Sequence, residues 1–184
     1  MLAPVVRELL LAAEANCERG TPMAMQMITW LIAIPLLGLV TGMRTFTPMA
    51  VLCWFAYLGN LPVDGTWAAW TAKLAVAVVF TVLAFAELVG DKLPKTPCRI
   101  APVPLIARLA MGALIGAIVA VGLEGSGAEA VILSILGVTV GAFGGFLIRR
   151  EIVRRFQCKD WPVALAEDVT AILCAVLAMG VITG

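Results

Sequence analysis

The sequence contains no histidine among its 184 residues. This absence excludes histidine-ligated haem, histidine zinc sites, Ser-His catalysis and imidazole proton relays. Cysteine is sparse and scattered, with no CxxC pair, at Cys17, Cys53, Cys98, Cys158 and Cys174. We interpret these residues as small apolar side chains or free thiols rather than disulfides or metal ligands. The sequence identifies no cofactor.

Charged residues are also scarce. They make up 14% of the chain, whereas hydrophobic residues make up 62% and the mean hydropathy is +1.04. Ordinary globular domains are about a quarter charged and about half apolar. The apolar runs are continuous rather than striped, which indicates burial in lipid. We therefore predict an all-α integral membrane protein with one domain over residues 27–184 and no nucleic-acid partner.

Residues 1–26 differ from the rest of the chain. Their apolar and charged residues can form a short amphipathic helix, with Leu9 and Leu10 on one side and Arg7 and Glu14 elsewhere. The segment lacks the basic region, apolar core and cleavage site of a signal peptide. We predict a cytoplasmic tail.

Five transmembrane helices are predicted in a compact bundle, at about 28–58, 67–90, 103–123, 130–156 and 163–182. The first stretch would measure roughly 45 Å as a continuous helix, longer than a bilayer core of about 30 Å requires. It also contains a polar interruption from Gly42 to Pro48. We favour one long, tilted and kinked helix; the alternative is two half-helices that meet at this interruption.

Basic residues lie on one side of the predicted bundle. Nine of the thirteen fall in two regions on that side, namely Lys92, Lys95, Arg99, Arg108, Arg149, Arg150, Arg154, Arg155 and Lys159. The opposite loops carry Asp64, Glu124 and Glu129. Because basic loops stay in the cytoplasm, we predict that this side and the N-terminus are cytoplasmic. A double crossing by residues 28–58 would move the N-terminus to the other side.

Glycines recur at every fourth position in three predicted helices. The pairs or triplets are Gly38 and Gly42, Gly112 and Gly116, and Gly137, Gly141 and Gly145. Small residues at this spacing allow helices to approach closely in lipid. They predict packing within the bundle or, for the triplet, a homodimer interface.

Arg44 lies well inside the first predicted span. A charged side chain there costs at least a few kcal/mol unless it is paired or hydrated. Pro48 cannot donate a hydrogen bond to the Arg44 carbonyl, and Thr45 and Thr47 add hydroxyl groups. Three interpretations are open: an internal ion pair with Glu87 or Glu167, a role in binding a substrate or ion, and snorkelling.

Four carboxylates are predicted at a similar depth. Glu87 and Asp91 share a face near the end of the second span, and Glu167 and Asp168 would open the fifth helix, where acids also favour the helix dipole. With nearby bases they predict either closed salt bridges or a site for a divalent cation or an anion. The candidate ligand or ion pathway comprises Arg44, Thr45, Thr47, Glu87, Asp91, Lys92, Arg99, Arg108, Glu167 and Asp168. A contact with anionic lipid is predicted at Arg149, Arg150, Arg154 and Arg155.

Several segments carry a resemblance to a known family: TGMRTFTPMAV, AELVGDKLPKTPCRIAPVPLIAR, GAFGGFLIRREIVRRF and LAEDVTAI. In this order they resemble the bacterial membrane family catalogued as domain of unknown function 4126, over residues 28–180. The resemblance implies a multi-pass inner-membrane protein. It implies polar motif positions at Arg44, Glu87, Asp91, Lys92, Pro94, Arg99, Arg108, Glu167 and Asp168, and it supplies no activity.

Three functions are compatible with these patterns. We favour a small inner-membrane transporter or channel for an ion or small anionic solute, because intramembrane charge lies beside an interrupted helix. The alternatives are an accessory subunit whose charges pair internally and a metal-dependent enzyme acting on a lipid headgroup. The sequence favours a protein that is not an enzyme.

Overall fold

The computed structural model describes residues 29–90, 102–156 and 160–184. Every regular element in these residues is helical. The elements are a π-helical turn η1 (Thr29–Ala33), α3 (Ile34–Met43), α4 (Thr47–Tyr57), a 3-10 turn η2 (Ala69–Ala72), α5 (Leu74–Gly90), α6 (Pro102–Gly122), α7 (Gly127–Phe156) and α8 (Asp160–Thr183). The predicted all-α class is confirmed for this part of the chain. Residues 1–28, including the predicted amphipathic tail, lie outside it.

Long apolar helices give the bundle its membrane character. In the described ranges, three helices are long and apolar enough to cross a bilayer: Pro102–Gly122, Gly127–Ile152 and Val163–Thr183. The outer surface also exposes large apolar side chains, such as Phe85 (64%) and Leu177 (65%). Such a surface fits a lipid surrounding. Three of the five predicted spans are thus supported, while α5 is apolar but shorter, with 17 residues.

The stretch from Thr29 to Tyr57 is not one helix, so the favoured interpretation of a single kinked span is wrong. Helix α3 ends because Arg44 adopts an extended backbone, with φ −137° and ψ 117°. Pro48 then lies in the first turn of α4. Proline is tolerated there because the first N–H groups of a helix have no partner within the helix. The interruption predicted at Gly42–Pro48 is therefore a complete break.

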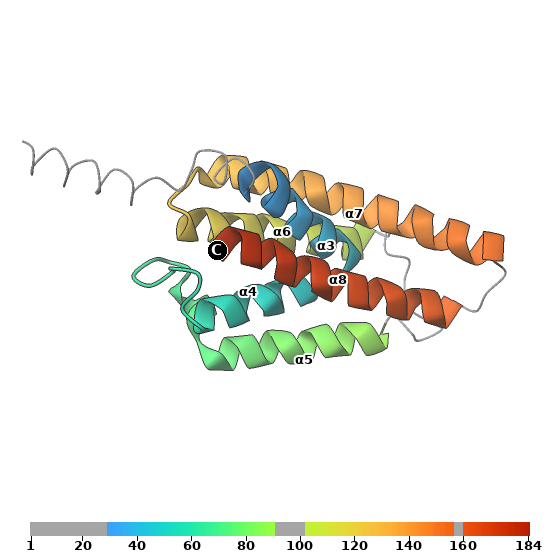
Figure 1. The fold of residues 1–184 in the computed structure, drawn as a ribbon, viewed down its shortest axis with the longest axis horizontal. Coiled ribbons are helices and arrows are strands. Elements are labelled where there is room, and N and C mark those ends of the chain that lie inside the picture. Colours follow the sequence, from blue (N-terminus) through green and yellow to red (C-terminus); the bar gives the residue numbers. More distant parts are fainter. Residues whose placement is uncertain (1–28, 91–101, 157–159) are drawn as a thin grey trace, which may run out of the picture.

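The two short helices return the chain to the end at which it entered (Figure 1). The side chain of Trp30, before α3, lies against Gly125, and that of Leu61, after α4, lies against Gly122. Gly122 is the last residue of α6, and Gly125 follows in the turn before α7. Thr29 therefore lies at the end of the bundle opposite to the break. The break lies at the basic end, where Arg108 contacts it. The predicted topology placed the N-terminal side at the basic end, and Thr29 does not lie there.

Helices α3 and α4 form the centre of the bundle. Leu37 and Val40 of α3 and Met49 and Leu52 of α4 have no exposed surface. Helix α3 packs on α6, α7 and α8, and α4 packs on α5 and α8. Irregular backbone at membrane depth is tolerated when protein surrounds it. The longer helices thus shield the two short ones.

Close packing of α3 on α7 depends on glycine. A Cβ at Gly38 would collide with the Ser134 carbonyl, and a Cβ at Gly137 with the Pro35 carbonyl. Gly141 faces Leu39 in the same way. The predicted packing role of these glycines within the bundle is therefore observed at this interface. A homodimer through Gly137, Gly141 and Gly145 remains a prediction, and it would have to compete with α3 for two of them.

Candidate functional site

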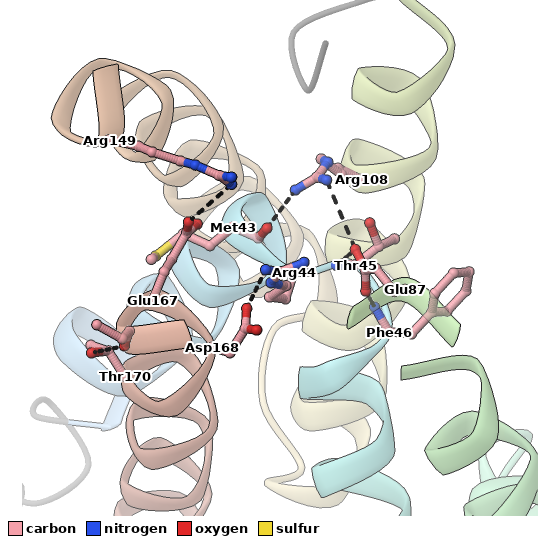
Figure 2. A network of polar contacts seen from close by, with 11 residues as sticks. Met43, Arg44, Thr45, Phe46, Glu87, Arg108, Arg149, Glu167, Asp168 and Thr170 are labelled. Atoms are coloured by element: carbon pink, nitrogen blue, oxygen red, sulfur yellow. Dashed lines mark hydrogen bonds and ion pairs between the residues drawn. The ribbon is translucent and has the colours of Figure 1, made fainter. Parts of the chain in front are cut away.

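The break between α3 and α4 exposes backbone groups that have no partner within either helix. Glu87, near the end of α5, accepts hydrogen bonds from two of them (Figure 2). Its Oε1 lies 2.8 Å from the Thr45 nitrogen, and its Oε2 lies 2.9 Å from the Phe46 nitrogen. A carboxylate also complements the positive end of the α4 dipole. Glu87 therefore acts as a cap for α4 supplied by another helix.

Arg108 of α6 binds the backbone on the α3 side of the break. Its Nη1 donates to the carbonyl oxygens of Gly42 at 2.5 Å and Met43 at 2.8 Å. These are among the last carbonyls of α3, where a positive charge is favoured by the helix dipole. Arg108 is 4% exposed, and its Nη2 lies 3.8 Å from Glu87 Oε1. Glu87 and Arg108 together satisfy both broken ends and pair with each other.

Arg44 occupies the break itself. Its guanidinium forms an ion pair and a hydrogen bond with the carboxylate of Asp168 on α8. Arg44 has no exposed surface and Asp168 is 5% exposed. We define the helix-break cluster as Arg44, Glu87, Arg108 and Asp168. It carries two positive and two negative charges, drawn from the break and from α5, α6 and α8.

A third ion pair lies beside this cluster, where Arg149 of α7 is 3.7 Å from Glu167 of α8 (Figure 2). Both residues line a cavity of about 350 Å³ between α3, α7 and α8. Its remaining walls are mostly apolar and include Leu39, Met43 and Ile148. Arg44 and Asp168 do not line this cavity. The cavity and the helix-break cluster are thus neighbouring but distinct features.

The family model for domain of unknown function 4126 (DUF4126) matches residues 31–181. The chain belongs to this family. The resemblance inferred from the motifs is thereby confirmed, and the DUF4126 match includes every residue of the helix-break cluster. No curated protein and no solved structure matches the chain.

In this DUF4126 chain, distant motifs meet at the break. The structure brings together six of the predicted pathway residues, which are Arg44, Thr45, Glu87, Arg108, Glu167 and Asp168. Thr45 takes part through its backbone nitrogen. The hydroxyl of Thr47 is buried and has no hydrogen-bond partner among the described residues. Asp91, Lys92 and Arg99 lie outside the described residues.

Two expectations about the acids on α8 need correction. The partner predicted for Arg44 was Glu87 or Glu167, whereas the described residues show an ion pair of Arg44 with Asp168. Glu167 and Asp168 were also expected in the first turn of their helix, but α8 begins at Asp160. About two turns of helix therefore precede them, so Glu167 and Asp168 are too far from the start of α8 to complement its dipole.

Two functional contributions were not predicted. Arg149 was assigned to lipid contact alone, yet it pairs with Glu167 across α7 and α8. The backbone of Gly42, Met43 and Phe46 also binds side chains from other helices. The polar interruption at Gly42–Pro48 was the available signal, because the ends of an interrupted helix must find new partners.

The carboxylates near the break do not form a metal site within the part of the chain that the structure describes. No group of three or more Asp, Glu or Cys residues suited to a metal occurs there. The divalent-cation site considered around Asp91 stays a prediction, because that residue lies outside the described ranges. The chemistry available in the described site is that of guanidinium groups, which bind carboxylates, phosphates and other anions.

Proposed function

We propose that the protein is a small membrane transporter or channel for an ion or small anionic solute, and that the helix-break cluster is its closed gate. The observation that carries this proposal is the fully buried Arg44. It lies at the break between α3 and α4 and pairs with Asp168 on α8. Burying each member of an ion pair costs several kcal/mol. Intramembrane charges beside broken helices are common features of substrate and ion pathways.

The two ion pairs of the cluster have different contacts. Glu87 and Arg108 bind the backbone ends of α4 and α3. Asp168 accepts a hydrogen bond from the Arg44 side chain. A buried pair of this kind is often replaceable by apolar residues without loss of stability. A buried pair between two side chains is a place where a solute anion could exchange with one partner, and we assign Arg44 and Asp168 a role in binding.

In the proposed cycle, a small anion competes with the Asp168 carboxylate for the Arg44 guanidinium. Guanidinium groups bind carboxylate, phosphate and similar anions through charge-assisted hydrogen bonds. Exchange of the partner would release α8 from the break, because Asp168 lies on α8 and Arg44 follows α3. The solute therefore opens the gate that it passes.

We further propose that the protein lies in the bacterial inner membrane with the break towards the cytoplasm. Arg149, Arg150, Arg154 and Arg155 lie at that end of α7, whereas Glu129 lies in its first turn and Glu124 just before it. The positive-inside rule supports this orientation. Thr29 would then lie near the outer side.

Anion flux into proteoliposomes tests the proposal, with chloride, nitrate, acetate and phosphate as probes. The wild-type protein should conduct at least one probe above empty liposomes. Arg44→Gln should reduce that flux by at least about tenfold, equivalent to losing about 1.4 kcal/mol of binding. Asp168→Asn should increase it by weakening the closed gate.

Thr81→Val is a matched control, because it removes a hydrogen bond of 3.0 Å between Trp54 of α4 and Thr81 of α5, away from the break. Its flux should equal that of the wild type. The proposal fails if no probe crosses, or if Arg44→Gln and Asp168→Asn leave the flux unchanged.

A second candidate is an accessory membrane subunit with purely structural charges. The contacts of Glu87 and Arg108 with the broken backbone favour it, because they stabilise the fold without requiring a ligand. This candidate predicts no flux of any probe. It also predicts that Arg44→Gln and Asp168→Asn lower the stability by similar amounts.

A further inference from the structure

We infer that the cavity between α3, α7 and α8 binds one acyl chain of an anionic phospholipid, with the lipid phosphate on Arg149. The cavity of about 350 Å³ falls in the range of about 300–1,000 Å³ that is usual for ligand sites. This site is separate from the proposed gate, since the Arg44 and Asp168 side chains do not line it.

The shape of the cavity fits a chain that lies along a helix. Its lining on α7 extends from Val140 to Ile152, which corresponds to about 18 Å along the helix axis. Leu39 and Met43 of α3 supply further apolar walls. Gly144 lies in this groove, and a Cβ there would meet no atom within 4 Å. The glycine thus leaves open space that a larger side chain would occupy.

The cavity has charged residues at one end and apolar residues at the other, as expected for a site that binds a lipid. Its charged lining residues are Arg149 and Glu167, and Arg149 lies near the end of the apolar span Gly127–Ile152. The opposite part of the groove, around Val140 and Gly141, lies deeper in that span. A phosphate near the membrane surface and an acyl chain towards the bilayer centre match this gradient.

Charge complementarity favours an anionic lipid over a neutral one. The side chain of Arg149 is 19% exposed although it lies 3.7 Å from Glu167, so a lipid phosphate can approach it from the surface. Arg150, Arg154 and Arg155 continue the positive charge along the same end of α7 and are exposed. Basic residues between transmembrane helices are a known pattern for binding acidic headgroups.

Native mass spectrometry of the full chain, with phosphatidylglycerol and phosphatidylcholine as probes, tests this inference. The wild-type protein should retain phosphatidylglycerol in preference to phosphatidylcholine. Gly144→Leu should fill the groove and reduce phosphatidylglycerol binding by at least about tenfold. Gly180→Leu is the matched control, because it adds the same side chain to an open helical position on α8 outside the groove, and its binding should stay at the wild-type level.

Two further variants separate lipid binding from helix packing. Arg149→Gln should weaken phosphatidylglycerol binding, whereas Glu167→Gln should maintain or strengthen it by removing a competing carboxylate. Both variants remove the same ion pair, so equal losses from both would show that the pair merely shapes the bundle and would overturn the inference. Equal binding by Gly144→Leu and Gly180→Leu would also overturn it, as would a change in oligomeric state confined to Gly144→Leu.

Discussion

The guanidinium of Arg108 lies 3.8 Å from the carboxylate of Glu87, and each side chain binds one end of the same helix break. Arg108 satisfies the last carbonyls of α3, and Glu87 satisfies the first N–H groups before α4. The pair thus replaces the hydrogen bonds that a continuous helix would have supplied. Its position explains how a broken backbone can persist within an apolar bundle.

Removing either member of this pair should destabilise the protein. Glu87→Gln and Arg108→Met should each lower the free energy of unfolding by about 3 kcal/mol, because each leaves a buried charge and backbone groups without their partners. The double variant should cost less than the sum of the two, since the residues share one network. Thermal unfolding in detergent measures these changes.

Thr81→Val is the control for that series, because its hydrogen bond with Trp54 also joins α4 to α5 but is solvent- or lipid-exposed. It should cost no more than about 1 kcal/mol. Losses from Glu87→Gln and Arg108→Met that are no larger than this would contradict the role assigned to the pair.

The reversal of the chain at the break predicts a short distance between Leu31 and Leu58. Both residues are well exposed and accessible to spin labels, at 63% and 65%. A continuous helix would separate them by about 40 Å. Double electron–electron resonance on Leu31→Cys/Leu58→Cys, with the native cysteines replaced, should give a clearly shorter distance. A distribution of distances centred near 40 Å would show instead that this stretch forms a single long helix.

Glycine substitutions should distinguish the α3–α7 interface from open helix surface. Gly137→Ala should lower the stability by about 1–3 kcal/mol, because its Cβ would meet the backbone of Pro35. Gly180→Ala meets no atom within 4 Å and should be neutral or stabilising by up to about 1 kcal/mol through helix propensity. Comparable unfolding midpoints for the two variants would argue against close packing at Gly137.

The sequence predicted those features that depend on local patterns. Continuous apolar runs identified α6, α7 and α8 to within three residues at each end. The polar interruption around Arg44 marked where the first predicted helix is interrupted, and six of the residues predicted beside it lie together in the structure. These signals are strong because burial of charge and loss of backbone hydrogen bonds are costly in lipid.

The same patterns did not determine how the interrupted stretch folds in space. A kinked helix and two antiparallel half-helices contain the same residues, and tertiary partners decide between them. Glu87 and Arg108, more than 40 residues away, supply those partners. The choice of Asp168 over Glu167 as a contact for Arg44 likewise depends on where α8 begins and on its rotation, which adjacent acids do not specify.

The proposed function requires that Arg44 and Asp168 serve the passage of an ion rather than the stability of the fold. The variant Arg44→Met/Asp168→Leu tests it most directly, because it removes both buried charges together and keeps apolar volume in their place. We expect a thermal unfolding midpoint close to that of the wild type, with anion flux into proteoliposomes reduced to the level of empty liposomes. A folded double variant that retains wild-type flux would show that neither charge serves the passage of an ion.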